Sequence, residues 1–181
     1  MSRALIGGVG NVLLGDDGFG PYVVHLLQSF YSFADNVEIV DLGTPALDLT
    51  HRIVDLDLLI LVDSIAGDGP PGTLLVYRKE DILREAPPQR LDPHSPALSE
   101  CLLTSEMLGA PPTNVLLVGV VGKDYECGLE LSAAACRSVE PAMNAILQEL
   151  DSMGFRYEKK ELPSEQSTWW GAQLEEITVD A

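Results

Sequence analysis

The chain has 181 residues, of which 46% are hydrophobic and 22% are charged, a composition typical of one globular domain with a full core. It carries 28 Asp and Glu against 11 Lys and Arg, which gives a net charge of −17. A surface this acidic repels phosphate backbones and anionic lipid, so nucleic acid and membranes are not expected as partners, and no apolar run reaches the roughly 18 residues that cross a bilayer.

The first third of the chain alternates between apolar strands and helices. In the first helix, apolar side chains recur at helical spacing, at Val23, Leu26, Leu27 and Phe30. The third strand is the most apolar of the three, which is typical of a buried position in a sheet. The elements predicted here are a strand over 4–9, a helix over 16–33, a strand over 37–40, a short helix over 45–54 and a strand over 58–62.

Proline and glycine divide the rest of the chain. Residues 86–97 contain four prolines, too many for a helix interior, so we expect a structured loop that carries His94. From residue 157 the pattern is polar and aperiodic, which predicts a flexible tail over 157–181 after a domain over 1–156. The remaining predicted elements are an edge strand over 73–77, a helix over 98–108, a strand over 114–121 and a helix over 131–153.

This alternation predicts an α/β fold: a three-layer sandwich with a twisted, mostly parallel sheet of about five strands and helices on both faces. Right-handed crossovers place the carboxyl ends of successive parallel strands at one edge of the sheet. Open α/β sheets form their binding sites at that edge. The segments that follow the first three strands should therefore meet there, and they are residues 10–17, 41–44 and 63–64.

Asp17, Asp63 and His94 are the candidate metal-ligating and catalytic residues. Two carboxylates and an imidazole suit a borderline divalent metal such as nickel or zinc, and three protein ligands leave a coordination position open. Each residue also has a plain structural interpretation, because Asp caps helices and turns and a lone His in a loop is often on the surface. Convergence at the sheet edge brings the two acids together but does not place His94.

The other histidines and the cysteines are weaker candidates. His25 faces away from the apolar stripe of its helix, and His51 is expected on the surface. The three cysteines form no CxxC pair and are expected as small core residues; a nucleophilic pair of Cys101 with His94 is conceivable, but nothing visibly lowers the pKa of that thiol. Without a long apolar secretory segment, we expect reduced thiols and a cytoplasmic location.

The glycine-rich turn after the first strand also partly matches a dinucleotide-binding fingerprint. Residues 8–13 read GxGxxL and lack the third glycine, and Asp41 lies 31 residues past Gly10 rather than the usual ~20. Asp16 and Asp17 stand at the helix start that would receive a pyrophosphate, and their charges would repel it. The same position suits a cation, with the glycines allowing tight turns and close backbone approach. We therefore expect no nucleotide cofactor.

Residues 8–20, GVGNVLLGDDGFG, resemble the opening motif of the [NiFe]-hydrogenase maturation endopeptidases, which has the form GxGNxLxxDDGxG. The Leu42 position is often glycine in that family, and the predicted tail has no counterpart that we can match. The resemblance covers roughly residues 3–152, most of the chain. It continues through DLGT at 41–44, DS at 63–64, PHS at 93–95 and the strand over 116–122.

The resemblance implies a twisted, mostly parallel sheet between helices. It also implies an endopeptidase that removes the C-terminal extension of a [NiFe]-hydrogenase large-subunit precursor after nickel insertion, with the nickel carried by the substrate. It assigns metal contact and catalysis to Asp17, Asp63 and His94. Hydrogen bonds to the substrate are then expected from Asn11, Asp41, Gly43 and Thr44.

Three other classes stay open at this point. A nucleotide-binding oxidoreductase would be protected by nucleotide against thermal unfolding. A non-catalytic maturation scaffold would hold the precursor through the acidic rim and leave it intact. A general metallopeptidase would cleave unrelated peptides and retain its own metal on purification.

Overall fold

The computed structural model describes residues 2–45, 48–84 and 98–162. The elements are β1 (Ala4–Val9), η1 (Gly15–Gly18), α1 (Phe19–Phe30), β2 (Tyr31–Phe33), β3 (Val37–Gly43), α2 (Asp48–Arg52), β4 (Leu58–Ile65), β5 (Leu74–Arg78), α3 (Lys79–Arg84), α4 (Leu98–Met107), β6 (Asn114–Val121), α5 (Ala133–Cys136), α6 (Val139–Met153) and β7 (Tyr157–Lys159). The predicted strands and helices are confirmed in type and order, apart from the differences described below.

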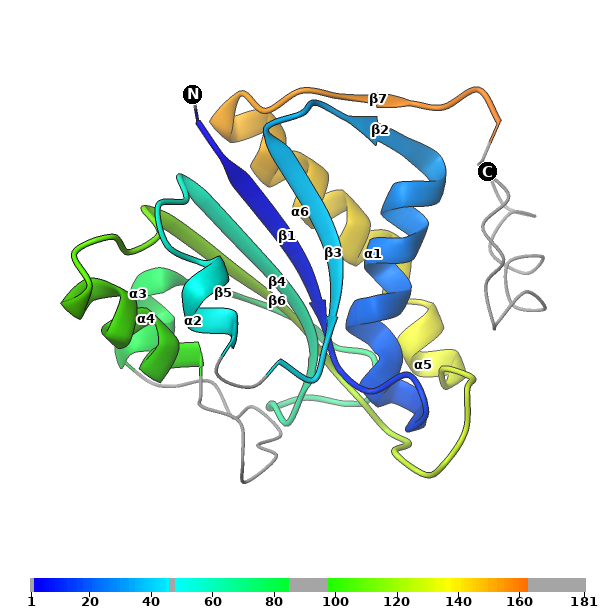
Figure 1. Cartoon of the computed structure of the whole chain (residues 1–181). Coiled ribbons are helices and arrows are strands. Elements are labelled where there is room, and N and C mark those ends of the chain that lie inside the picture. Colours follow the sequence, from blue (N-terminus) through cyan, green and yellow to red (C-terminus); the bar gives the residue numbers. More distant parts are fainter. Residues whose placement is uncertain (1, 46–47, 85–97, 163–181) are drawn as a thin grey trace.

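The main sheet has the strand order β3-β1-β4-β6-β5 (Figure 1). β3, β1, β4 and β6 are parallel, and β5 pairs with β6 in the antiparallel direction at one edge. β4 is central and buried along almost its whole length, which is typical of a parallel strand with helices on both faces. The predicted mostly parallel sheet and the edge strand over 73–77 are confirmed.

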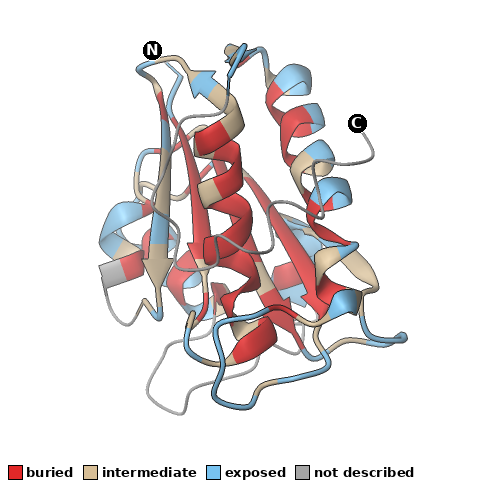
Figure 2. Ribbon diagram, turned by 90° about the vertical axis from the view of Figure 1, so that its right-hand side faces the viewer, coloured by how far each residue is buried: buried red, intermediate tan, exposed pale blue. Residues whose placement is uncertain are grey.

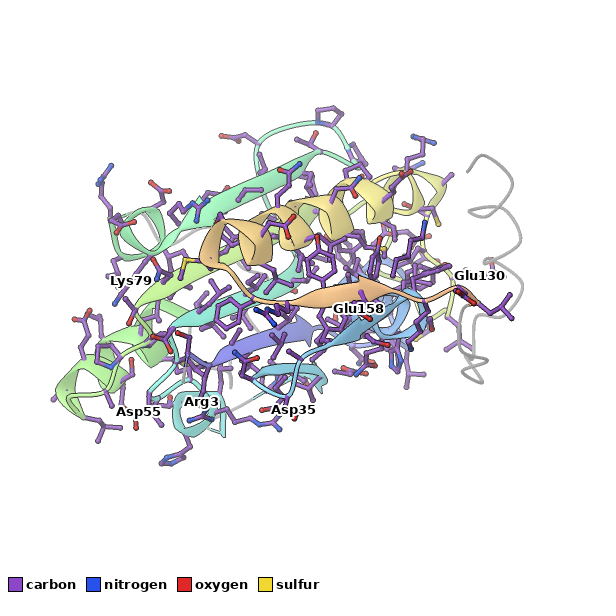
Figure 3. The ribbon with its side chains drawn as sticks, turned by 90° about the horizontal axis from the view of Figure 1, so that it is seen from above. Arg3, Asp35, Asp55, Lys79, Glu130 and Glu158 are labelled. Carbon is purple, nitrogen blue, oxygen red and sulfur yellow. The ribbon has the colours of Figure 1, made fainter. Side chains whose placement is uncertain are left out.

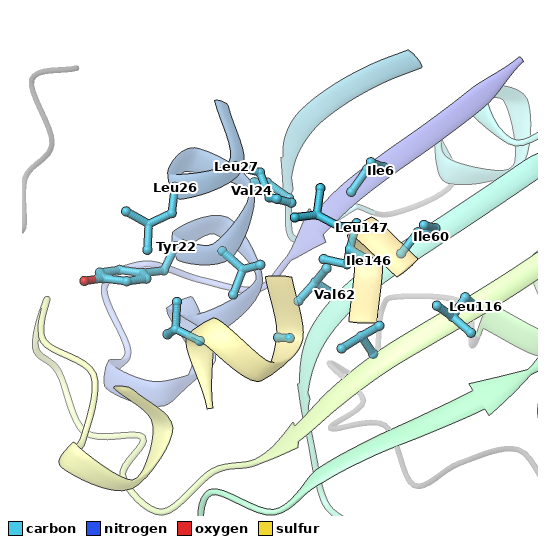
Figure 4. Close-up of a cluster of buried hydrophobic side chains, with 14 of the residues drawn as sticks. Ile6, Tyr22, Val24, Leu26, Leu27, Ile60, Val62, Leu116, Ile146 and Leu147 are labelled. Carbon is cyan, nitrogen blue, oxygen red and sulfur yellow. The ribbon is translucent and has the colours of Figure 1, made fainter. Parts of the chain in front are cut away.

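Helices cover both faces of the sheet, as the sandwich prediction requires. α1, α5 and α6 lie on one face, and α2, α3 and α4 lie on the other (Figure 1). α1 is buried along most of its length because it packs against both the sheet and α6 (Figure 2). Each face has its own core. The larger core includes Ile6, Val24, Ile60 and Ile146 (Figure 4), and the smaller one includes Leu5, Ile53, Ile82 and Leu102.

The first helix is shorter than predicted at both ends. Gly15–Gly18 form a 3₁₀ turn before α1, and at Tyr31 the backbone becomes extended, with φ −129° and ψ 149°. The short strands β2 and β7 then pair with each other, and the rings of Tyr31, Phe33 and Tyr157 pack together. Aromatic residues favour strands. The folded part therefore continues past the predicted boundary at residue 156. Residues 163–181 of the tail predicted over 157–181 lie outside the described residues.

The predicted helix over 131–153 is two helices, α5 and α6. In one continuous helix the ring of Pro141 would clash with the carbonyl of Arg137. Because α6 begins at Val139, Pro141 lies in its first turn, where a proline is tolerated. The Ser138 hydroxyl donates to the carbonyl of Gly72 at 2.5 Å and so ties the break to the loop before β5. Among the described residues, no helix has the length and apolar character needed to span a membrane.

Candidate active site

The three predicted segments meet at the carboxyl edge of the sheet, the lower edge in Figure 1. β1 is flanked by β3 and β4, and Gly8 pairs with Asp41 on one side and with Val62 on the other. The N–H of Gly10 donates to the carbonyl of Gly43 at 2.8 Å. This convergence was predicted from the parallel order of the strands and is confirmed. We call this edge, with residues 10–17, 41–44 and 63–64, the rim.

Glycine allows the turn after β1 to lie directly against neighbouring backbone. Gly10 has φ +134°, and a methyl group there would lie 1.8 Å from the carbonyl oxygen of Asp17. A methyl group at Gly20 would lie 2.2 Å from the carbonyl oxygen of Val62 and 2.3 Å from that of Val9. The start of α1 therefore sits on the ends of β1 and β4, and the predicted role of the glycines in close approach is confirmed.

Asp17 is half-buried and points back to the glycine turn. Its Oδ2 accepts the N–H of Asn11 at 2.8 Å. The Asp17 side chain does not cap the first helix, which was its structural alternative. The N-cap of α1 is Gly18, and no side chain accepts a hydrogen bond at that helix start. The carboxylate of Asp17 is thus placed by the turn that opens the rim.

Asp63 lies inside β4 rather than after it, because the strand continues to Ile65 and pairs Asp63 with Gly119 of β6. Its Oδ1 accepts the N–H of Ser64 at 2.7 Å. Burial raises the pKa of the Asp63 carboxyl well above its usual range; the Ser64 N–H opposes this in part, and the negative charge of Asp17 adds to it. The charge of Asp17 therefore disfavours the charged form of Asp63, and a bound cation would relieve this.

His94 lies in the predicted loop over 86–97, outside the described residues, so its place beside the two acids stays a prediction. Within the part of the chain that the structure describes, no group of three or more His, Cys, Asp or Glu side chains could hold a metal ion. The described part of the candidate site is therefore the acidic pair Asp17 and Asp63.

The predicted substrate-binding residues all lie on the rim. The side-chain Oδ1 of Asn11 accepts the N–H of Leu13 at 3.0 Å, and the Oδ1 of Asp41 accepts the N–H of Gly43 at 2.8 Å. Asp41 belongs to β3, which runs three residues further than predicted. Asp41 and Thr44 are exposed, whereas Asn11 and Gly43 are half-buried. Their predicted contacts with substrate stay untested.

The remaining histidines and cysteines partly differ from prediction. His51 is exposed as expected, and His25 is half-buried, with its Nε2 3.8 Å from the Oδ2 of Asp41. Cys101 is a core residue as expected, and burial raises the pKa of its thiol, which disfavours a nucleophilic thiolate. Cys127 is exposed, so its prediction as a core residue is wrong, because it belongs to the loop between β6 and α5.

Sequence reasoning missed the role of Asp16. This side chain is fully buried, and its carboxylate accepts hydrogen bonds from Lys123, Asp124 and Ser132. A pair of adjacent acids at a helix start suggested a cap for one of them, and the actual partners of Asp16 lie more than a hundred residues along the chain. No local signal could have identified them.

Solved structures define the class of protein to which this fold and this rim belong. The structure superposes on the Escherichia coli hydrogenase maturating endopeptidase HybD with a TM-score of 0.79 and 30% identity, covering 87% of this chain and 98% of that one. The hydrogenase 2 maturation peptidase of Thaumarchaeota archaeon SCGC_AB-539-E09 gives a TM-score of 0.64 and 35% identity, over 83% and 99% of the two chains.

Sequence comparison leads to the family. The family model HycI, hydrogenase maturation protease, matches residues 21–149. The hydrogenase 2 maturation protease of Escherichia coli (strain K12) is 32% identical over 153 residues, 84% of this chain and 93% of that protein. The chain belongs to the hydrogenase maturation protease family. It is a peptide-bond hydrolase with an endopeptidase role in hydrogenase maturation.

Proposed function

We propose that this protease removes the C-terminal extension of a [NiFe]-hydrogenase large-subunit precursor after nickel insertion, and that it recognises the nickel carried by the substrate. The observation that carries the proposal is the acidic pair on the rim. Asp17 and Asp63 stand at the same edge of the sheet, and the pKa of Asp63 is raised by burial and, to a smaller extent, by the charge of Asp17. Such a pair favours a partner that brings positive charge.

The chemistry of the pair explains why a metal-loaded precursor would be preferred. When no cation is bound, burial and, to a smaller extent, the charge of Asp17 favour the protonated form of Asp63 by raising its pKa. A divalent ion presented by the substrate compensates both charges at once. Two carboxylate oxygens, joined by the imidazole of His94, are a donor set that suits a borderline ion such as nickel. Binding is then coupled to the presence of the metal.

The rim would also position the peptide to be cut. A tetrahedral intermediate needs hydrogen-bond donors at the developing oxyanion and a polarised or activated water. Asn11 is hydrogen-bonded to Asp17, and Gly43 to Gly10 of the same turn; together with Thr44 they are the proposed contacts to the substrate backbone. In this scheme the enzyme contributes position and charge, and the precursor contributes the metal.

The decisive experiment mixes the purified protein with nickel-loaded and with nickel-free precursor and follows the mass of the large subunit. We expect the mass to fall only for the nickel-loaded form. Equal cleavage of the nickel-free form would contradict substrate-borne metal recognition. A stable complex with an intact precursor would instead indicate a scaffold, and cleavage of unrelated peptides would indicate a general metallopeptidase.

Matched variants connect this outcome to the site. Asp17→Asn and Asp63→Asn keep a side-chain oxygen that can accept the neighbouring N–H but remove the charge. Both variants should therefore abolish cleavage and preserve the fold, as should His94→Ala. Asp35→Asn and His51→Ala are the controls. Asp35 is exposed in the turn before β3, at the amino end of the sheet away from the rim, and is labelled in Figure 3. Cleavage at the wild-type rate by both rim variants would overturn the proposal.

A further inference from the structure

Asp16 anchors the loop between β6 and α5 to the turn that carries Asp17. Its Oδ2 accepts the N–H of Lys123 at 2.7 Å and the N–H of Asp124 at 3.1 Å. Its Oδ1 accepts the N–H of Ser132 at 2.7 Å, and the Ser132 hydroxyl donates to Oδ2 at 2.9 Å. Four donors at a fully buried carboxylate form a strong fixed attachment, since hydrogen bonds to a charged acceptor are stronger than neutral ones.

Backbone hydrogen bonds reinforce this attachment. The N–H of Asp16 donates to the carbonyl of Asp124 at 2.8 Å, and the N–H of Gly15 donates to that of Gly128 at 3.0 Å. Gly128 in turn donates to the carbonyl of Leu13 at 3.0 Å. We call residues 123–132 the anchor loop. The loop is therefore hydrogen-bonded through the backbone to Leu13, Gly15 and Asp16.

The anchor loop also reaches the second acid of the site. The hydroxyl of Tyr125 and the hydroxyl of Ser64 are 3.0 Å apart and hydrogen-bonded, and Ser64 follows Asp63 in β4. The same loop is thus attached next to Asp17 through Asp16 and next to Asp63 through Ser64. It spans the two segments that carry the acidic pair.

The geometry of η1 turns this attachment into a constraint on Asp17. A 3₁₀ turn has about three residues per turn, so consecutive side chains leave it roughly 120° apart. In Gly15–Gly18 the side chain of Asp16 is held in the anchor loop, and the side chain of Asp17 is directed to the N–H of Asn11. If the side chain of Asp16 were released, η1 could rotate, and the direction of the Asp17 carboxylate would change with it.

We infer that Asp16 is a positioning residue for peptide-bond cleavage: through the anchor loop it sets the placement of Asp17 relative to Asp63. The inference rests on the proposed function, in which Asp17 and Asp63 face the substrate metal. The side chain of Asp16 is itself fully buried, so it is not exposed to a substrate. Its removal should affect turnover more than binding, because displacing a catalytic group by about 1 Å can cost up to about 100-fold in rate.

The test compares two buried carboxylates, one behind the site and one far from it. Asp16→Asn keeps the shape of the side chain but places an amide NH₂ among backbone donors. Glu149→Gln is the matched control: the Glu149 side chain is 8% exposed and accepts both guanidinium N–H groups of Arg78, at 2.6 and 2.8 Å, between α6 and β5. Both variants lose a buried, charged acceptor, so both should unfold at a lower temperature.

Cleavage of nickel-loaded precursor separates a positioning role from a structural one. Well below the unfolding temperature of each variant, and per folded molecule, we expect Asp16→Asn to lower kcat by roughly 10- to 100-fold, with KM changed by less than about threefold. Glu149→Gln should keep the wild-type kcat. Equal kcat values for Asp16→Asn and wild type would overturn the inference, as would an equal fall for both variants.

A milder variant keeps the inference testable if Asp16→Asn does not fold. Ser132→Ala removes one of the four donors and leaves the three N–H groups in place, so it should lower kcat several-fold without raising KM; a wild-type kcat would contradict the inference. Asp17→Asn, assayed in parallel, distinguishes a failure of the positioning role from a failure of the proposed function. If Asp17→Asn is inactive and the anchor-loop variants turn over normally, only the positioning role of Asp16 fails. If Asp17→Asn is active, the proposed function fails.

Discussion

Replacement of Gly10 by Ala perturbs the site through the backbone alone. Gly10 has φ +134°, a conformation that costs an L-residue about 1–3 kcal/mol. The added methyl group would also lie 1.8 Å from the carbonyl oxygen of Asp17. No side-chain rotation can relieve that contact, because both atoms belong to or adjoin the backbone, and overpacking of this kind costs roughly 1–3 kcal/mol more. Gly10→Ala should therefore lower the free energy of unfolding by roughly 2–6 kcal/mol.

Gly109→Ala is the control that separates the contact from the backbone conformation. Gly109 has φ +75°, and a methyl group there would meet no atom within 4 Å. Only the left-handed backbone is penalised, at about 1–2 kcal/mol. With a urea m-value of about 1–3 kcal/mol/M, the unfolding midpoint of Gly10→Ala should fall further than that of Gly109→Ala, by roughly 1 M.

The same pair of variants reports on function. Relief of the contact at Gly10 has to displace Asp17, so Gly10→Ala should also lose cleavage of nickel-loaded precursor per folded molecule, whereas Gly109→Ala should keep it. Urea unfolding followed by circular dichroism gives the two midpoints, and mass measurement of the precursor gives the cleavage rates. Equal midpoints together with equal cleavage would refute the view that close backbone approach places Asp17.

Other measurements test the burial and charge of single groups. The pKa of Asp63 is raised in the folded protein, so the wild type should lose stability as the pH rises from the unfolded-state pKa of Asp63 through its folded-state pKa. Asp63→Asn lacks this titration. In urea unfolding between about pH 4 and 8, the stability of Asp63→Asn relative to the wild type should therefore increase with pH. Glu149→Gln should cost about 1.5–3 kcal/mol in urea unfolding, because Arg78 loses a charged partner. Iodoacetamide should label native Cys127, which is exposed, much faster than Cys101, which is buried, as peptide mass analysis can show.

The fold could be predicted wherever burial on both faces leaves a continuous apolar run. The strands over 58–62 and 114–121 were predicted for this reason, and they form the centre of the sheet. β2 and β7 could not be predicted, because each has only three residues and gains its hydrogen bonds from a partner distant in the chain. The break between α5 and α6 had a visible cause in Pro141, but its position is set by Ser138, whose partner Gly72 is also distant.

The candidate site was predictable to the extent that it follows from topology. Parallel strands must end at one edge, so Asp17 and Asp63 were brought together by strand order alone. Local pattern could not show which of the two adjacent acids is buried, because Asp16 and Asp17 share the same turn and the partners that bury Asp16 come from a distant segment. His94 shows the limit of the same reasoning, since a loop between two helices is not tied to the sheet edge by strand order.

The two acids of the rim are held in different ways, and this difference has a consequence for substrate selection. Asp63 belongs to the central strand β4, where it pairs with Gly119 of β6 and directly follows Val62, the last residue paired with β1, so the sheet holds its backbone. Asp17 belongs to a single turn whose position depends on Gly10, Asn11 and the anchor loop bound by Asp16. The spacing of the acidic pair is therefore adjusted from the Asp17 side. Under the proposed function, changes in η1 or in the anchor loop would alter how the pair meets a substrate metal while the sheet remains unaltered.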